Sequence, residues 1–151
     1  MFDLRPIAWV VSTRSEPVDD GWGSEITRIV LDEAVPEEAL LGIDSFSHLE
    51  IIGLATVASE VPPAPWSRRP RGNEAWPVAG VFAQRNKDRP NRLLLSVVEL
   101  TSLSGRELIV RGLDFIDGTP VLDIKPVFRW TQPRGPIEAP SWTDEIGENY
   151  F

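Results

Sequence analysis

The stretch RLLLSVVELTSLSGRELIVRG, residues 92–112, carries the strongest folding signal in the sequence. Residues 92–103 form an almost unbroken apolar run, which predicts a fully buried β-strand. Ser104 and Gly105 give a short turn signal, and residues 106–112 return to β-favouring side chains. The stretch therefore predicts a β-hairpin.

Short apolar segments on both sides of this hairpin predict further strands. Fourteen prolines and eleven glycines punctuate these segments, and helical periodicity is scarce. The pattern favours an all-β or β-dominated barrel or sandwich, and 151 residues suit a single domain. The expected strands cover residues 4–13, 25–32, 46–58, 78–85, 113–116 and 121–124, and the expected short helices lie at 36–43 and within 141–151, the latter capped by Ser141 or Thr143.

The composition removes several classes of site. The chain has no cysteine, which excludes disulfides, thiolate chemistry and Cys-containing zinc sites and suits a reducing cytoplasm. Its single histidine, His48, excludes multi-histidine metal clusters, so we expect no metal. No apolar run approaches the ~18 residues of a membrane span, so we expect a cytoplasmic protein without a membrane partner.

The chain is acidic, but its charged residues are unevenly distributed. The net charge of −8 argues against a generic nucleic-acid coat, because such binding depends on an excess of Lys and Arg. Residues 68–92, however, are rich in arginine and predict a local basic face. The preceding loop, residues 61–77, combines proline, arginine and tryptophan. Such a loop is either a solvated surface segment or a contact for phosphates and unpaired bases.

Common catalytic motifs are missing. GWGSE, residues 21–25, precedes strand-like sequence rather than a helix, which argues against a dinucleotide-type site. Ser47 and His48 are adjacent, and on a strand their side chains would point to opposite faces, which disfavours a hydrolase. A lone histidine on an apolar strand is more often a packed residue than a general base.

The segment RGLDFIDGTPVLDIKP, residues 111–126, interrupts two strand-like runs with three aspartates. Asp117 followed by Gly118 is typical of a β-turn. Asp114 is either a cap for backbone N–H groups or a ligand contact. Asp123 and Lys125 suit a surface ion pair of small energetic value.

Several blocks together resemble the TsaA-like family, also called the TrmO or YaeB-like family. The blocks are FSHLE (46–50), GVFAQR (80–85), RPN (89–91) and the 111–126 segment. The resemblance implies a small single-domain β-barrel over residues 1–151, without the second, C-terminal domain of longer members. It implies a homodimer and methyl transfer from S-adenosylmethionine to N6 of threonylcarbamoyladenosine 37 in tRNA.

The resemblance also implies six cofactor contacts and assigns no catalytic residue. An arginine can hold the cofactor's carboxylate through paired hydrogen bonds, an aspartate can accept from ribose hydroxyls, and a glycine lets the backbone come close. The chain departs from the family pattern where it has RPNRLL (89–94) instead of RPNPIG. The six positions are Arg85, Leu95, Arg111, Gly112, Leu113 and Asp114.

Two alternatives stay open beside a tRNA methyltransferase. One is a methyltransferase of the same fold with another, small-molecule substrate, and the other is a binding module without catalysis. The basic segment 68–92 favours tRNA, whereas the net charge and the expected lack of a C-terminal domain favour the alternatives.

Overall fold

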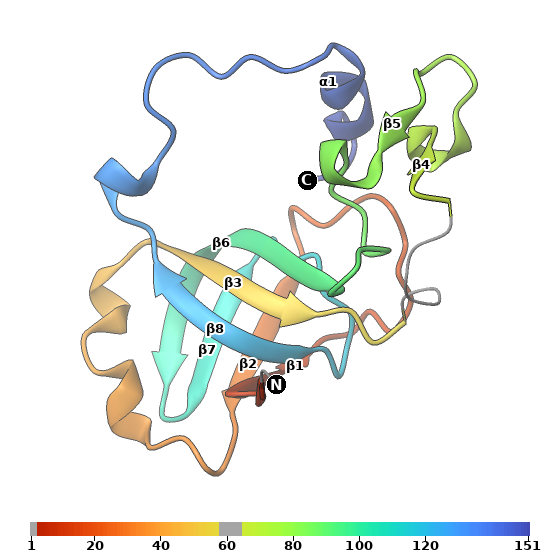
Figure 1. The fold of residues 1–151 in the computed structure, drawn as a ribbon. Helices are drawn as coiled ribbons and strands as arrows, with labels where there is room; N and C mark the ends of the chain where they lie inside the picture. Colours follow the sequence, from red (N-terminus) through yellow and green to blue (C-terminus); the bar gives the residue numbers. More distant parts are fainter. Residues whose placement is uncertain (1–2, 58–64) are drawn as a thin grey trace.

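Six antiparallel strands close into a barrel in a computed structural model that describes residues 3–57 and 65–151. The strands follow the order β1-β2-β7-β6-β3-β8 around the barrel (Figure 1). The predicted all-β barrel is therefore confirmed. The barrel strands are β1 (Ala8–Val11), β2 (Ile26–Leu31), β3 (His48–Leu54), β6 (Leu93–Ser104), β7 (Glu107–Arg111) and β8 (Pro120–Pro126).

The predicted hairpin is confirmed as β6 and β7, which pair from Ser104 opposite Glu107 back along both strands. Gly105 closes the turn with a φ of 56°, a conformation that glycine adopts without steric cost. The prediction that residues 92–103 are fully buried is wrong. Ser96 and Val98 point into the protein, while the alternate side chains of β6 are exposed. One face of the strand alone turns toward the interior, as the two-residue period of a strand requires.

The barrel interior holds one apolar core. Inward-facing residues of all six strands meet there with Leu113 and Phe115, which lie in the loop between β7 and β8. The loop therefore contributes its apolar residues to the core without forming a strand, and the predicted strand at 113–116 is wrong. The buried core residues are Ala8, Val10, Ile29, Leu31, Leu40, Leu49, Ile51, Val98, Leu108, Val110, Leu113, Phe115 and Val121.

The observed strands differ in length from several of the remaining predicted ones. Residues 4–13 contain the four-residue β1, and residues 25–32 and 121–124 correspond closely to β2 and β8. Residues 46–58 contain β3, and Ala58 lies outside the described residues. The strand predicted at 78–85 is wrong, because that segment forms the two-residue β5 followed by a 3₁₀ turn.

The predicted helix at 36–43 is also wrong as a single helix. The segment forms two 3₁₀ turns, η1 (Glu37–Leu40) and η2 (Ile43–Ser45), and Gly42 between them has a φ of 82°, which ends the first turn. The predicted C-terminal helix is confirmed as α1 (Trp142–Gly147). Ser141 occupies the predicted N-cap position, although its side chain makes no capping bond, and the Thr143 hydroxyl donates to the Pro140 carbonyl.

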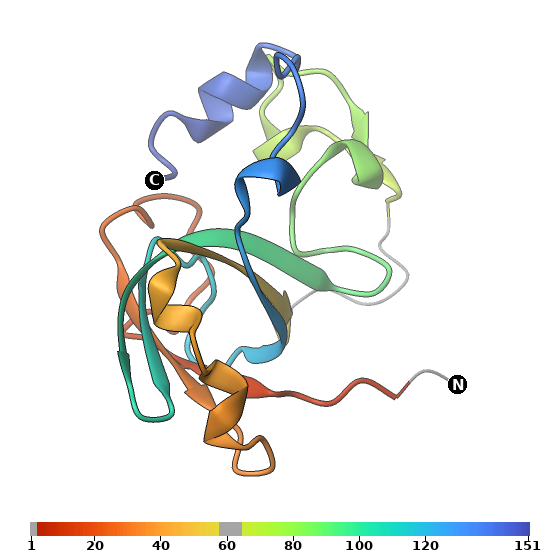
Figure 2. The ribbon, with the colours of Figure 1, turned by 90° about the vertical axis from the view of Figure 1, so that its left-hand side faces the viewer.

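A small second layer covers the β6 side of the barrel. β4 (Ser67–Arg68) pairs with β5 (Ala79–Gly80) in this layer, and α1 lies beside them (Figures 1 and 2). Most of the predicted loop 61–77 belongs here, although residues 61–64 lie outside the described residues. The remaining 3₁₀ turns are η3 (Pro70–Gly72), η4 (Val81–Ala83) and η5 (Arg129–Thr131).

Candidate functional site

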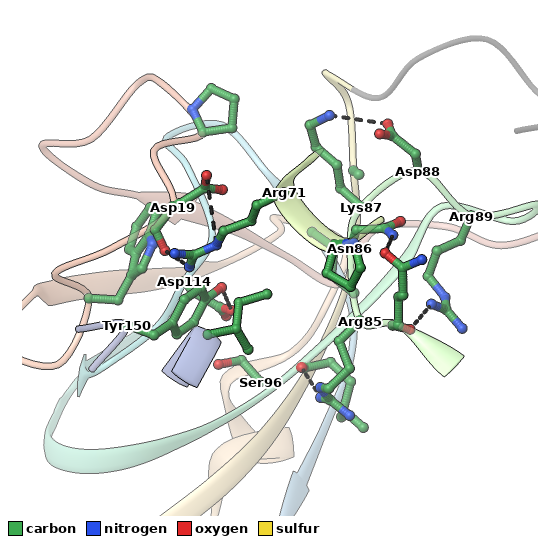
Figure 3. A pocket seen from close by; sticks show the side chains of 18 of the residues that line it. Asp19, Arg71, Arg85, Asn86, Lys87, Asp88, Arg89, Ser96, Asp114 and Tyr150 are labelled. Carbon is green, nitrogen blue, oxygen red and sulfur yellow. Dashed lines mark hydrogen bonds and ion pairs between the residues drawn. The ribbon is translucent and has the colours of Figure 1, made fainter. Parts of the chain in front are cut away.

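A cleft of about 1230 Å³ lies between the barrel and the second layer (Figure 3). Ligand sites of small molecules and cofactors are concave and have volumes of roughly 300–1,000 Å³, so this cleft has room for a cofactor and part of a second substrate. Its walls come from five stretches that are far apart in the sequence. These stretches are residues 17–22, 68–72, 82–97, 114–119 and 142–151, and residues 55–57 at the end of β3 complete the lining.

Three buried polar atoms in the wall of the cleft make no hydrogen bond within the described part of the chain. They are Asn86 Oδ1, Ser96 Oγ and Asp114 Oδ1. Buried polar atoms in folded proteins are nearly always hydrogen-bonded, and an unpartnered one requires an explanation. All three can accept a hydrogen bond, and two of them accept only. Their convergence on one cleft indicates a ligand with several hydrogen-bond donors.

Cations form another part of the wall. Arg85 donates to the Leu95 carbonyl at 3.1 Å, and Arg89 donates to the Val81 and Gln84 carbonyls at 3.0 and 2.6 Å. Arg69 likewise donates to the Trp76 carbonyl. A carbonyl satisfies one N–H group but does not neutralise the guanidinium charge. These arginines therefore keep positive charge at the cleft, in contrast to cations that have carboxylate partners.

The carboxylate-paired cations lie farther along the same wall. Arg71 pairs with Asp20 at 2.8 Å, and Asp88 accepts from Arg68 at 2.9 Å and from Lys87 at 3.1 Å. These ion pairs hold the second layer together and link it to the loop between β1 and β2. The predicted basic face at residues 68–92 is therefore partly neutralised.

The outer face of β6 gives the cleft an apolar floor. Leu93, Leu95 and Val97 line it and are 41%, 46% and 52% exposed. Phe82 also lines it, 75% exposed, with the Arg89 guanidinium 5.9 Å from its ring centre. Apolar walls with a few convergent polar groups are typical of cofactor sites.

Asp114 has a partner from the far end of the chain. The Tyr150 hydroxyl donates to Asp114 Oδ2 at 2.6 Å (Figure 3). Burial raises the pKa of the Tyr150 phenol, and the neighbouring Asp114 carboxylate raises that pKa further. The phenol is therefore a permanent hydrogen-bond donor at neutral pH. The expectation that Asp114 either caps backbone groups or faces a ligand missed this contact.

The structure brings together three of the six residues carried over from the family resemblance. Arg85, Leu95 and Asp114 line the cleft, and Arg85 is bonded to the Leu95 backbone. Their contact with a cofactor stays a prediction.

The other three predicted residues are not among those that line the cleft. Leu113 is fully buried in the barrel core. Arg111 lies on the barrel surface and pairs with Glu99 at 3.5 Å. Gly112 has a φ of 81°, and its N–H donates to the Glu25 carbonyl. This arrangement makes Gly112 a turn residue that directs Asp114 away from β7.

Sequence reasoning missed Ser96, Asn86 and Tyr150. Ser96 is a lone hydroxyl in the apolar run 93–98, which is a usable signal, since a buried serine requires a partner. Asn86 stands in a polar turn where an amide is unremarkable. Tyr150 is the single tyrosine of the chain, and nothing local links it to Asp114.

The turn at Asp117 and Gly118 is confirmed. Asp117 Oδ1 accepts from the Ser12 N–H at 3.0 Å, and Gly118 has a φ of 74°. The surface pair of Asp123 and Lys125 is also confirmed, at 2.6 Å.

The expectation that the side chains of Ser47 and His48 point to opposite faces of a strand is wrong. Ser47 precedes β3, so the strand geometry does not apply to it, and its Oγ lies 2.8 Å from His48 Nδ1. Neither residue is among those that line the cleft.

Residues 3–57 and 65–151 contain no group of three or more His, Cys, Asp or Glu residues placed to hold a metal ion. Within the same residues, no helix is long and apolar enough to cross a membrane.

Comparison with known proteins identifies close similarities. Residues 12–131 match the model of the tRNA-methyltransferase O N-terminal domain. Over 110 residues the chain is 36% identical to the human tRNA (adenine(37)-N6)-methyltransferase, covering 68% of this chain and 23% of that protein. The corresponding mouse protein is 39% identical over 97 residues, covering 60% of this chain and 21% of that protein. The chain thus spans between a fifth and a quarter of the length of these relatives.

A relative of similar length and a solved structure cover more of the chain. A protein of Methanothermobacter thermautotrophicus named "Probable S-adenosyl-L-methionine-binding protein" is 35% identical over 133 residues, which are 83% of this chain and 89% of that one. The crystal structure of TrmO from Pseudomonas aeruginosa superposes with a TM-score of 0.73 at 27% identity, covering 91% of this chain and 61% of that one.

Proposed function

Because this chain belongs to the family of the tRNA-methyltransferase O N-terminal domain, we propose that it is an S-adenosylmethionine-dependent methyltransferase acting on tRNA. The observation that carries the proposal is the set of three unpartnered acceptors in the cleft, at Asn86, Ser96 and Asp114. Relatives named for tRNA methylation and for S-adenosylmethionine binding support it.

The cleft fits the chemistry of this cofactor. S-adenosylmethionine offers donors in its ammonium group, its ribose hydroxyls and its adenine amine, which match acceptors at three positions. Arg85 is a cation suited to the carboxylate, since an arginine binds a carboxylate through two parallel hydrogen bonds. In this assignment Asp114 accepts from a hydroxyl or the ammonium group, and Leu95 contacts an apolar part of the cofactor.

The proposed reaction needs little from the protein beyond positioning. The bound cofactor supplies an electrophilic methyl group on a sulfonium. The chain's contribution is to hold the attacking nitrogen in line with that methyl group, and alignment alone lowers such a barrier substantially. As the bond from nitrogen to the methyl group forms, the bond from sulfur to that group would break, S-adenosylhomocysteine would leave, and the proton of the nitrogen would pass to solvent. The arginines with uncancelled charge, Arg69 and Arg89, suit phosphates of the acceptor RNA.

We further propose N6 of threonylcarbamoyladenosine 37 as the methyl acceptor. The human and mouse relatives are named for the N6 position of adenine 37, which supports this choice. The single-stranded anticodon loop around position 37 offers splayed bases and phosphates, the features that proteins use in single-stranded RNA. The cytoplasm is the proposed compartment, which the absence of cysteine suits.

Two measurements test the proposed function. Titration calorimetry with S-adenosylmethionine is expected to give saturable, one-site binding, and failure to bind would remove every methyltransferase hypothesis. Mass spectrometry of tRNA nucleosides from a deletion strain is expected to show unmethylated threonylcarbamoyladenosine, restored by the gene on a plasmid. Cofactor binding with unchanged tRNA nucleosides would point instead to a small-molecule acceptor or to a binding module.

We also propose that the protein is a homodimer. The exposed apolar stripe Leu93, Leu95 and Val97 on β6, which forms the floor of the cleft, supports an apolar contact between subunits at the cleft. Light scattering after size exclusion is expected to give twice the 16.9 kDa chain mass. Val97→Asp is expected to yield monomers, whereas Leu4→Asp, a change at another exposed apolar residue, on the N-terminal arm, is the control. A monomeric wild type would refute the dimer.

A further inference from the structure

One wall of the cleft comes from a segment beyond the family match. The family model ends at residue 131, whereas Trp142, Ile146, Gly147, Tyr150 and Phe151 line the cleft. Figures 1 and 2 show α1 and the C-terminus returning to the second layer after a long excursion from the barrel. Whatever these residues do in the cleft is therefore a property of this chain in addition to the family domain.

The returning segment is anchored on both sides. The Trp76 Nε1–H group donates to Glu145 Oε2 at 2.7 Å, and the Trp76 and Trp142 rings lie 6.4 Å apart. Farther along, the Trp22 N–H donates to the Tyr150 carbonyl at 2.8 Å. A Cβ added at Gly23 would lie 2.4 Å from the Phe151 carbonyl carbon, so that only glycine permits this close approach.

These anchors place the Tyr150 hydroxyl against one oxygen of Asp114. The bond from Tyr150 to Asp114 Oδ2 is 2.6 Å long, and it fixes the rotation of the carboxylate about its last torsion. The other oxygen, Oδ1, is left buried without a partner within residues 3–57 and 65–151. A carboxylate held in this way presents a preorganised acceptor, whereas a free one would lose rotational freedom on binding.

We propose that Tyr150 is a positioning residue that holds Asp114 so that its second oxygen accepts a hydrogen bond from a donor of the bound cofactor. The proposal rests on the proposed function, because it takes S-adenosylmethionine as the ligand. The groups that face the Tyr150 phenol are Asp114, Arg71 and Asp19. Because the phenol stays protonated, it donates to Asp114 throughout the neutral pH range.

The test is a double-mutant cycle on cofactor affinity, measured by calorimetry with S-adenosylmethionine. Tyr150→Phe keeps the ring and its packing but removes the donor, and it is expected to raise Kd roughly three- to tenfold. In the Asp114→Ala background, which has no acceptor for the phenol, the same change is expected to alter Kd less than twofold, because Tyr150 acts through the carboxylate. Equal effects in both backgrounds, or an unchanged or lower Kd for Tyr150→Phe, would overturn the proposal.

A second measurement needs no change at Tyr150. The chain has a single tyrosine, so selective ¹³C labelling of its ring gives one Cζ resonance. Saturation with S-adenosylmethionine is expected to shift this resonance in the wild type and to leave it in place in Asp114→Ala. A shift that persists in Asp114→Ala, or no shift in a wild type that binds, would contradict this inference alone. A wild type that does not bind the cofactor would refute the proposed function as well. Failure of the inference about Tyr150 can therefore be distinguished from failure of the proposed function.

Discussion

Arg85 keeps a full positive charge at the cleft, because its hydrogen bond goes to the backbone carbonyl of Leu95 rather than to a carboxylate. Its side chain is exposed and contributes little to the core, so it can be removed without opening a cavity. Hydrogen bonds to charged groups contribute about 1.5–3 kcal/mol, which makes Arg85 a strong anchor for an anionic group of the cofactor.

Arg85→Ala is therefore expected to weaken S-adenosylmethionine binding by about one to two orders of magnitude while the urea midpoint stays unchanged. Arg129→Ala, at an exposed arginine that does not line the cleft, is the matched control and is expected to keep wild-type affinity. Titration calorimetry with S-adenosylmethionine on the wild type and the two variants measures these affinities. A wild-type Kd for Arg85→Ala would refute the assignment of this residue.

Tyr150 makes the stability of the protein depend on alkaline pH. Burial, with the Asp114 charge beside it, raises the pKa of the folded phenol above its ordinary value of 10.0. At a pH between the pKa of the phenol in the unfolded chain and its higher pKa in the folded chain, the unfolded chain has lost a proton that the folded chain keeps. The free energy of unfolding is therefore complete below pH 10 and decreases as the pH rises above it.

Tyr150 is expected to lower the free energy of unfolding by at most about 1.4 kcal/mol per pH unit above pH 10, and Tyr150→Phe is expected to lack this contribution. Urea denaturation at pH 9, 10 and 11 gives the free energy of unfolding for both proteins. Lys125, whose pKa is also raised by Asp123, contributes equally to both, so the difference between them isolates Tyr150. Parallel pH profiles for the two proteins would contradict the role given to the phenol.

At the level of elements, β3 and the loop before β8 meet at Gly53. The pairing of β3 with β8 shifts register between Ile52 and Gly53, and the Phe115 ring packs over Gly53. A Cβ at this position would lie 2.6 Å from Phe115 Cε2. Phe115 is 1% exposed and belongs to the barrel core, so a shift of its ring would disturb the packing there. The glycine thus lets the loop that carries Asp114 close onto the barrel.

Gly53→Ala is expected to lower the free energy of unfolding by about 1–3 kcal/mol, the usual cost of overpacking a core. Gly147→Ala, in α1 with open space around it, is the matched control and is expected to be neutral or to stabilise by about 0.5–1 kcal/mol. Urea midpoints measure both changes. Equal midpoints for the two variants would show that the Phe115 contact does not constrain β3.

At the scale of the whole molecule, an acidic protein presents a basic cleft. The net charge is −8, yet among the residues that the structure describes six cations line the cleft against three acidic residues. Carboxylates neutralise some of these cations, and Arg69, Arg85 and Arg89 retain charge. Attraction of tRNA should therefore be local and modest.

The slope of log K for tRNA against log[salt] is expected to be about −1.4, the value for two contacts to single-stranded phosphates, one from Arg69 and one from Arg89. Arg69→Ala is expected to make that slope shallower by about 0.7, whereas Arg5→Ala, on the N-terminal arm, is expected to leave it unchanged. Fluorescence anisotropy with an anticodon stem-loop at several salt concentrations measures both. A slope near zero would exclude phosphate contacts at the cleft.

The elements that could be predicted are those whose signals are local. The hairpin around Gly105 and the turn at Asp117 and Gly118 depend on backbone preferences of adjacent residues, and both were predicted correctly. The segment 78–85 was not, because its apolar residues serve the second layer and the cleft instead of a sheet. The run 92–103 was assigned the wrong burial because hydrophobicity alone does not say whether a second face is covered.

The sequence by itself determined that the chain is a β-rich domain with turns at glycines 105 and 118, and its blocks pointed to Arg85, Leu95 and Asp114. Only the tertiary structure decided that these three share a cleft with Ser96 and Tyr150. The physical reason is the distance along the chain over which each kind of interaction acts. Dihedral preferences and the two-residue period act between neighbours, whereas the contact from Tyr150 to Asp114 joins residues 36 positions apart and exists only when barrel, second layer and C-terminal segment are packed together.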